Sequence, residues 1–328
     1  MSVPPGAGGV PVISTVDYHT GGEPFRIVVA GAPPIPGATV AERRLAARAP
    51  EIDVIRRLLC HEPRGHADMY GCFLVPPDDP GARFGAVFWH KDGYSTACGH
   101  GTIALGAWAV DTGLAAPGSE VPIDVPSGRV VAKVERDAVT FRSVPSYVLA
   151  RGIGVRTAYG TAEADLSYGG AVYASVPAAA LGLALRPGSL GALIAAGREV
   201  KAALSGHPAA EHPADPRLSG VYGVVFHEEL GPGRQRNVTV FADGEVDRSP
   251  CGSGTAARLA LLHEDGFRGT LTHESLVGSV FTARVAAETV SEGRPAVIPE
   301  VTGMAYRTGE HRFTLDPRDP LGPGFTLR

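Results

Sequence analysis

The chain has 328 residues, of which 44% are hydrophobic and 20% charged, and its formal net charge is −4. At about 100–200 residues per domain, this length predicts two domains, each able to bury a core. No run of Lys or Arg forms a cationic track, which argues against nucleic acid or an anionic membrane as a partner. No stretch reaches the ~18 apolar residues of a membrane helix and no basic, apolar leader opens the sequence, so we expect a cytoplasmic protein.

Two of the four cysteines lie in apolar surroundings. Cys60 follows VIRRLL and Cys72 precedes FLV, which predicts small buried side chains rather than reactive groups. No two cysteines form a CxxC pair, and no Cys/His spacing is typical of a metal site. No lysine lies in a motif that supports pyridoxal phosphate. We therefore expect neither a metal nor an organic cofactor.

A predicted strand and a predicted helix flank the third cysteine, Cys98. GAVFWH, at residues 85–90, is rich in β-branched and aromatic residues and runs into a turn signal. Cys98 is followed by Gly-x-Gly-Thr and then by an Ala- and Leu-rich run of about three turns that ends at Gly113. The pattern places Cys98 at the amino end of a helix, on a glycine-rich approach.

The same order recurs around Cys251. NVTVFA, at residues 237–242, predicts a strand, and the run after Cys251 reads Gly-x-Gly-Thr and ends at Gly266. When Cys98 is placed on Cys251, further residues coincide at the same offset: Phe88 with Phe241, Gly99 with Gly252, Gly101 with Gly254, Thr102 with Thr255, Ala104 with Ala257, and Ala107 with Ala260. This agreement predicts two related halves that each bring one cysteine to an equivalent place.

A cysteine at a helix start is suited to proton transfer. The first amides of a helix lack intrahelical partners and stabilise an anion, so we expect the thiol pKa to be lowered and a substrate carboxylate to be held there. Inversion of a stereocentre needs one group to remove the Cα proton and another to return it on the opposite face, so one thiolate and one thiol must cooperate. A single CGxGT motif is more often a structural turn, whereas two matched copies favour catalysis.

Long segments of the chain resemble the proline racemase superfamily, which includes proline racemases, 4-hydroxyproline 2-epimerases and trans-3-hydroxyproline dehydratases. The resemblance covers nearly the whole sequence. The segments that carry it are DYHTGGEPFRIV at 17–28, EPRGHADMYG at 62–71, GYSTACGHGT at 93–102, RNVTVFADGEVDRSPCGSGT at 236–255, GSVFTA at 278–283 and GMAYRTG at 303–309.

This resemblance implies an α/β (α+β) fold of the diaminopimelate epimerase type. Such a fold has two pseudo-symmetric halves, each a curved sheet around a central helix, with the substrate in the cleft between them. We expect residues 1–140 to form the half with Cys98, completed by about residues 310–328, and residues 141–309 to form the half with Cys251. The resemblance also allows a homodimer.

Matching positions give each candidate site residue a role. Cys98 and Cys251 match the catalytic pair. The backbone amides of Gly99, His100, Gly252 and Ser253 match those that hold the carboxylate. His100 and Asp247 match the side chains at the ring nitrogen, and Tyr70 and Phe241 match the aromatic wall beside the ring. The alternatives are a backbone-bonded His100 at a helix start and Asp247 in a surface turn. His19 and His66 either fix turns or line the pocket.

The choice among family members rests on few positions. Cys251 favours racemisation, because dehydratases of this family generally carry threonine there. RGHADMYG differs from the RGSD typical of 4-hydroxyproline epimerases, and an aromatic pocket suits proline itself. ALGAWAVDTGL and the C-terminal region resemble the dehydratase branch, and Ala97 replaces a usual methionine. We expect a proline racemase, then a hydroxyproline 2-epimerase, then a 3-hydroxyproline dehydratase. A non-catalytic amino-acid binding protein and an isomerase of diaminopimelate or phenazine-precursor type are the remaining alternatives.

Overall fold

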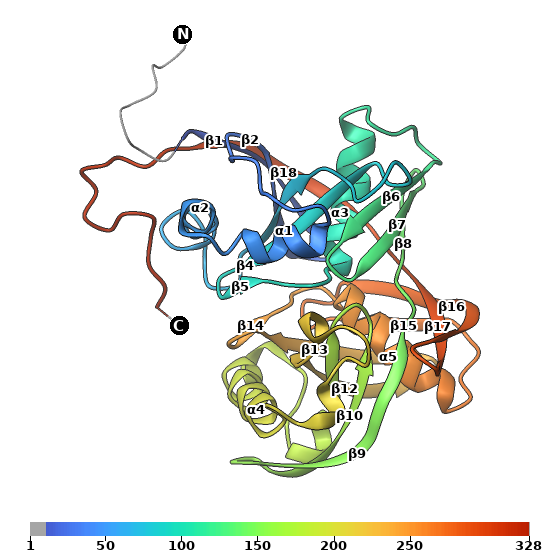
Figure 1. The fold of residues 1–328 in the computed structure, drawn as a ribbon. Coiled ribbons are helices and arrows are strands. Elements are labelled where there is room, and N and C mark those ends of the chain that lie inside the picture. Colours follow the sequence, from blue (N-terminus) through green and yellow to red (C-terminus); the bar gives the residue numbers. More distant parts are fainter. Residues whose placement is uncertain (1–10, 328) are drawn as a thin grey trace.

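A computed structural model describes residues 11–327 and shows two halves, each with a helix against a curved sheet (Figure 1). The first half contains strands β1 (Ile13–Thr20), β2 (Glu23–Ala30), β3 (Tyr70–Val75), β4 (Phe84–His90), β5 (Gly93–Tyr94), β6 (Glu120–Val125), β7 (Gly128–Val134) and β8 (Val139–Arg142). Its helices are α1 (Val40–Ala46), α2 (Pro50–Cys60) and α3 (Gly99–Asp111).

The second half repeats this order of elements. Its strands are β9 (Tyr147–Thr157), β10 (Gly160–Tyr168), β11 (Val172–Pro177), β12 (Val221–Gly231), β13 (Arg234–Phe241), β14 (Glu245–Val246), β15 (Leu271–Glu274), β16 (Val280–Ser291) and β17 (Arg294–Gly303). Its α-helices are α4 (Leu190–Ala203) and α5 (Gly252–Glu264), and four short 3₁₀ turns lie between β11 and β12. The last strand, β18 (Ala305–Phe313), returns to the first half.

Strand pairing confirms that the halves are related. In the first, β1–β2 is antiparallel, β2–β3 parallel, β3–β4 antiparallel, β4–β6 parallel, and β6–β7–β8 antiparallel. In the second, β10–β11 is antiparallel, β11–β12 parallel, β12–β13 antiparallel, β13–β15 parallel, and β15–β16–β17 antiparallel. The sequence repeat therefore extends to whole sheets.

Two pairings close this arrangement. β18 pairs antiparallel with β1, from Ile13 opposite Phe313 to Thr20 opposite Ala305, in the way that β9 pairs with β10. β8 pairs antiparallel with β17 and joins the two sheets edge to edge. The expected division at residue 140 falls inside β8, and the domain bounds stay a prediction.

The central helices α3 and α5 are buried on nearly every side. Each residue from Gly99 to Ala109 and from Gly252 to Leu261 is buried. A helix that is apolar all round belongs to a core, and Gly and Ala allow strands to approach it closely. No helix among residues 11–327 is long and apolar enough to cross a membrane.

Candidate active site

Cys98 caps the amino end of α3. Its backbone is extended (φ −154°), and the Gly101 N–H donates a hydrogen bond to its Sγ at 3.2 Å. The sulfur also lies 3.4 Å from His100 Nδ1. The side chain is thus held where the sequence pattern placed it, against the free amides of the helix start.

Cys251 occupies the matching place before α5, with a different backbone. Its φ is +61°, which is rare for a residue with a side chain and costs of order 1–3 kcal/mol. The Ser249 hydroxyl oxygen accepts the Cys251 N–H at 3.1 Å and fixes this turn. The two cysteines are therefore equivalent in sequence and approached by differently shaped loops.

The starts of α3 and α5 touch each other at Gly99 and Gly252. A Cβ added to Gly99 would lie 2.5 Å from Gly252 Cα, and one added to Gly252 would lie 2.7 Å from Gly99 Cα. Real Cβ atoms do not come this close to backbone, so both positions require glycine. The contact brings two positive helix ends together, which favours a bound anion there.

His100 and Asp247 lie between the helix starts and the rest of the site. His100 Nδ1 and Asp247 Oδ2 are 3.9 Å apart, and both side chains are buried. Asp247 Oδ1 accepts from the Ser249 N–H at 2.8 Å and from its hydroxyl at 2.7 Å, which leaves Oδ2 for another partner. Asp247 is thus a buried loop residue rather than a surface turn, and burial lowers the pKa of the His100 imidazole while Asp247 opposes this effect.

Aromatic rings form the opposite wall. Phe241 lies 5.8 Å from the Tyr70 ring and stacks at 5.7 Å on Tyr222. The Tyr70 hydroxyl bonds to the Ser95 hydroxyl and lies 3.1 Å from the Tyr222 hydroxyl. The Tyr173 hydroxyl bonds to Ser253 Oγ at 2.7 Å. The wall therefore carries several phenol oxygens, which the expectation of an apolar pocket did not include.

These groups surround one small, closed cavity. Its lining residues are Tyr70, Ala97, Cys98, His100, Tyr173, Tyr222, Thr239, Phe241, Asp247, Cys251 and Ser253. Seven of the nine predicted site residues are in this set; the other two, Gly99 and Gly252, lie in the contact between the helix starts. Sequence reasoning missed Tyr173, Tyr222 and Thr239. β3 and β12 are equivalent strands, but at the offset of the repeat Tyr222 coincides with Met69 rather than with Tyr70, so the repeat held no signal for Tyr222.

The expectation of lowered thiol pKa values is wrong for this closed site. Burial raises the pKa of Cys98 well above its usual range, and the Gly101 N–H only partly offsets this rise. Burial also raises the pKa of Cys251, and the neighbouring Asp247 carboxylate adds to the effect. The loss of water around a thiolate costs more than the helix amides return. Burial of both thiols therefore favours their protonated form.

Two other histidines fix turns. His19 Nδ1 accepts from the Gly22 N–H at 3.2 Å, and His66 Nδ1 accepts from the Asp68 N–H at 3.2 Å. Neither lines the cavity. Of the two readings that the sequence left open, these contacts favour the scaffold role.

One group of side chains has the donor atoms of a metal site. Ligand atoms of His90, Asp92 and Glu245 lie within 4.8 Å of one another. Three contacts already engage these atoms: His90 Nδ1 lies 3.0 Å from Glu245 Oε1, the Lys91 amine contacts Asp92 Oδ1 at 2.5 Å, and the Asp243 N–H donates to Asp92 Oδ2 at 2.9 Å. Burial raises the pKa of Glu245 and lowers that of His90 to about 3. A neutral carboxyl–imidazole pair that joins the halves accounts for this group.

The fold has two matching halves, and the candidate site lies at their junction. Comparison with known proteins gives the family. The family model described as proline racemase matches residues 15–326. The 3-hydroxyproline 2-epimerase of Burkholderia multivorans is 46% identical over 330 residues, which cover 96% of this chain and 98% of that protein. The trans-3-hydroxy-L-proline dehydratase of Azospirillum brasilense is also 46% identical, with the same coverage.

Solved structures agree with these sequence relatives. A hydroxyproline epimerase from Agrobacterium vitis, with bound trans-4-hydroxy-L-proline, superposes with a TM-score of 0.89 at 34% identity and covers 97% of this chain and 96% of its own. The chain belongs to the proline racemase family. Its fold is the two-halved, diaminopimelate epimerase-like arrangement that the sequence predicted.

Proposed function

We propose that this enzyme inverts Cα of a proline-type imino acid by proton transfer between Cys98 and Cys251, without a cofactor. One observation carries the proposal: the two thiols, at equivalent helix starts of two related halves, line the same closed cavity. Inversion needs a base on one face of Cα and an acid on the other, and two-fold related halves supply both. In this reaction a C–H bond breaks as one S–H forms, and the opposite S–H breaks as the new C–H forms.

The remaining polar groups fit the two ends of such a substrate. Free amides at Gly99, His100, Gly252 and Ser253 would hold its carboxylate against both helix ends. Asp247 Oδ2 and the His100 ring would bind its ammonium. The bound ammonium adds positive charge beside both sulfurs and so favours the thiolate that burial otherwise suppresses.

A ring hydroxyl on the substrate is the second candidate. The sequence alone favours proline as the substrate, because Tyr70 and Phe241 predict an apolar wall. The hydroxyls of Tyr70, Tyr173 and Tyr222 around the cavity favour a hydroxyproline, since a buried hydroxyl needs partners. The names of the relatives point the same way. Dehydration of 3-hydroxyproline begins with the same loss of the Cα proton, but the Cβ–O bond then breaks and the hydroxyl leaves as water, whereas in inversion Cα receives a new proton. The cytoplasm as location and a homodimer as assembly stay predictions.

Deuterium exchange in heavy water tests the proposal. L-proline, trans-3-hydroxy-L-proline and trans-4-hydroxy-L-proline are incubated separately, and deuterium at Cα, optical rotation and imino product are followed by NMR and polarimetry. We expect exchange with inversion, and a fall of about 10²–10⁴-fold in Cys98→Ser and in Cys251→Ser, because serine is a far weaker base. Cys72→Ala, in the buried β3, is the matched control and should keep the wild-type rate.

Each other outcome has a distinct meaning. Near-normal exchange in either serine variant rejects the two-thiol mechanism. An imino product without inversion assigns the dehydratase reaction instead. Faster turnover of a hydroxyproline than of proline, with a selective loss in Tyr70→Phe or Tyr222→Phe, assigns the second candidate.

A further inference from the structure

The reaction cavity is too small and too closed for a substrate to enter it directly. Its volume is about 10 Å³, at the lower limit of the roughly 10–15 Å³ that a cavity needs to hold one water molecule. Cys98 and Cys251 are only 5% and 6% exposed. A pyrrolidine ring therefore reaches the sulfurs only after part of the wall moves.

Tyr222 is the part of the wall that faces outward. Two larger pockets lie nearby, of about 580 Å³ and about 220 Å³, and each shares one lining residue with the reaction cavity, which is Tyr222 in both cases. Its side chain is partly exposed, although its ring stacks on Phe241. One phenol ring therefore separates the two thiols from both outer pockets.

Ring contacts and one hydrogen bond hold Tyr222 in place. Its hydroxyl pairs with the Tyr70 hydroxyl at 3.1 Å, and its ring contacts the rings of Tyr173, Phe241 and His90. Two residues earlier, Gly220 is exposed and has a φ of +91°, in the loop that leads into β12. The ring must give up these contacts to open the cavity, and the exposed loop beside it is the segment that would move with it.

Two cations line the smaller outer pocket. Arg44 of α1 and Lys201 of α4 enter it from opposite halves, and both are partly buried. Arg44 donates to the carbonyls of Tyr94 at 3.0 Å and Arg217 at 3.5 Å, and Lys201 donates to the carbonyl of Ala242. No Asp or Glu lines this pocket, whereas Asp92 and Asp243 line the larger pocket with Lys201 and oppose the lowering of its pKa by burial.

The third cation of the pocket is already neutralised. Arg217 pairs with Asp215 at 2.7 Å, at the exposed rim. Arg44 and Lys201 thus remain as two half-buried cations that face a space of amino-acid size, and the carboxylates near Lys201 do not line that space. Arg44 is the cation without a nearby carboxylate, and a small anion in the pocket would offset the cost of its partial burial.

We propose that this 220 Å³ pocket is an antechamber that binds the carboxylate of the incoming substrate, and that the Tyr222 ring is the gate between it and the two thiols. The antechamber is defined by Arg44, Ser95, Thr96, Lys201, Leu218 and Tyr222. The inference rests on the proposed function, because that function makes the ligand an amino-acid carboxylate. From there the carboxylate moves past Tyr222 to the helix amides at Gly99 and Gly252.

Alkylation of the two cysteines tests the antechamber without any racemase assay. Iodoacetate is a small carboxylate, and iodoacetamide is its neutral counterpart of the same size. The rate of labelling at Cys98 and Cys251 is followed by peptide mass spectrometry at about pH 8.5, near the ordinary thiol pKa. The ratio of the two rates cancels any change in thiol reactivity and reports only on the path of the anion.

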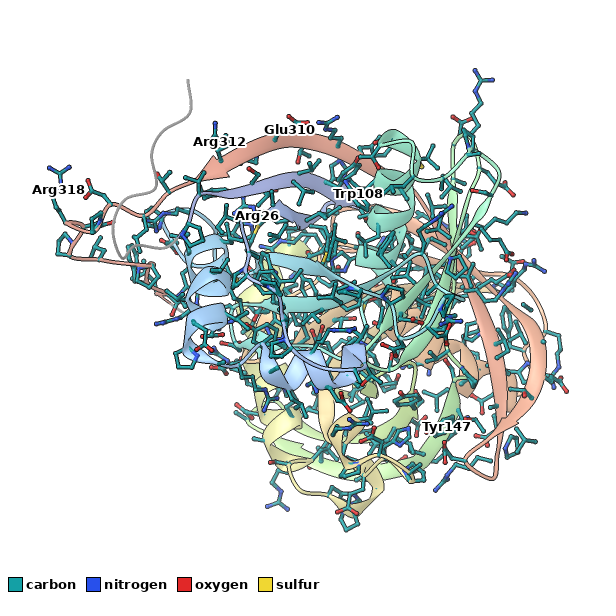
Figure 2. The ribbon with its side chains drawn as sticks, turned by 45° about the horizontal axis from the view of Figure 1, so that its top comes forward. Arg26, Trp108, Tyr147, Glu310, Arg312 and Arg318 are labelled. Carbon is teal, nitrogen blue, oxygen red and sulfur yellow. The ribbon has the colours of Figure 1, made fainter. Side chains whose placement is uncertain are left out.

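We expect Arg44→Gln and Lys201→Gln each to slow labelling by iodoacetate roughly 5- to 10-fold, because local charge concentrates the anion. Labelling by iodoacetamide should change less than about 2-fold in the same variants, since a neutral reagent does not feel that charge. At about 1 M salt, where the Debye length is about 3 Å, these variants and the wild type should be labelled by iodoacetate at the same rate. The matched control is Arg318→Gln, whose side chain is 88% exposed on the C-terminal segment and points away from the body (Figure 2). It should alter neither rate.

Tyr222→Ala should accelerate both reagents, because the ring no longer closes the cavity. If this variant does not fold by circular dichroism, Tyr222→Leu serves, since it keeps an apolar side chain and loses the ring. Equal slowing of both reagents in Arg44→Gln and Lys201→Gln, or unchanged labelling in the folded Tyr222 variant, overturns the antechamber. If the labelling pattern is as expected but no Cα exchange occurs, the proposed function is overturned instead. The pocket would then bind another small carboxylate.

Discussion

Burial governs the chemistry of all four cysteine side chains. The pKa of each is raised, in every case chiefly because the site excludes water. For Cys60 and Cys72 this agrees with the sequence-based prediction of inert core thiols. For Cys98 and Cys251 it means that helix position alone does not supply a thiolate. Under the proposed function, the ammonium of the substrate would supply the positive charge that favours a thiolate.

Raised thiol pKa values predict a loss of stability at high pH. An unfolded thiol has a pKa of about 8.5, and a buried thiol has a higher one. Below about pH 8.5 the free energy of unfolding therefore does not depend on this thiol. Above that pH it falls by about 1.4 kcal/mol per pH unit for each such thiol, because only the unfolded state loses the proton. Cys72 is fully buried, with burial as the cause of its shift. In Cys72→Ala, we expect the free energy of unfolding to fall less steeply between about pH 9 and 10.5, by about 1.4 kcal/mol per unit. Urea unfolding across this range checks it, and parallel slopes in the two proteins would contradict it.

At the scale of elements, the contact between the starts of α3 and α5 organises the site. The sequence placed glycines at 99 and 252 for the approach of a substrate carboxylate. The structure adds a second reason, since each glycine faces the backbone of the other helix. The two helix ends repel each other electrostatically and are held together by the sheets around them. A bound anion, such as the carboxylate of the proposed substrate, would relieve this repulsion.

Glycine-to-alanine variants test this contact. Gly99→Ala and Gly252→Ala each place a methyl group 2.5–2.7 Å from the opposing Cα. We expect a loss of roughly 1–3 kcal/mol in the free energy of unfolding, and a strong loss of Cα exchange, because the helices must separate. The matched control is Gly191→Ala in α4, where the new methyl group meets no atom within 4 Å. There we expect a neutral effect or a gain of up to about 1 kcal/mol. Thermal and urea unfolding measure both, and unchanged stability in Gly99→Ala would reject the contact.

The same elements show how far the sequence reaches. Local signals predicted the strand before each cysteine, the helix after it and the end of α3 before Gly113, which has a φ of +74°. The repeat predicted two equivalent halves. The sequence did not predict Tyr173 and Thr239 as site residues, because the cavity wall depends on which face of each strand turns inward once the two sheets meet. The sequence also did not predict the positive φ of Cys251, because the repeat makes the residues around Cys251 look equivalent to those around Cys98.

At the scale of the whole molecule, the first half fastens the loop that precedes Cys251. The Val246 N–H donates to Asp68 Oδ1 at 3.0 Å, and the Arg248 N–H donates to Glu23 Oε2 at 2.7 Å. Arg248 also pairs with Asp68 at 2.8 Å. These bonds cross from one half to the other, beside Asp247. The closed site is therefore a property of both halves together, and a ligand that fits it should stabilise their contact.

A planar analogue of the substrate provides the test of this closure. In pyrrole-2-carboxylate the carbon that corresponds to Cα is flat, as Cα would be after one thiolate has taken its proton and before the opposite thiol has donated one, so the analogue should bind more tightly than L-proline. At about 100 times its Kd, we expect it to add about 2.7 kcal/mol to the free energy of unfolding. For a chain of this size that corresponds to a rise in Tm of several degrees. Differential scanning calorimetry and titration calorimetry measure the two quantities.

Pyrrole-2-carboxamide is the matched control, because it keeps the planar ring and lacks the charge. The amides at the starts of α3 and α5 are donors that attract an anion through two helix ends at once. A neutral carboxamide cannot use that charge, and its NH₂ group would face further donors. We therefore expect it to leave Tm unchanged at the same concentration. Equal stabilisation by both compounds would show that ring packing against Tyr222 and Phe241, rather than the paired helix starts, holds the ligand and closes the two halves.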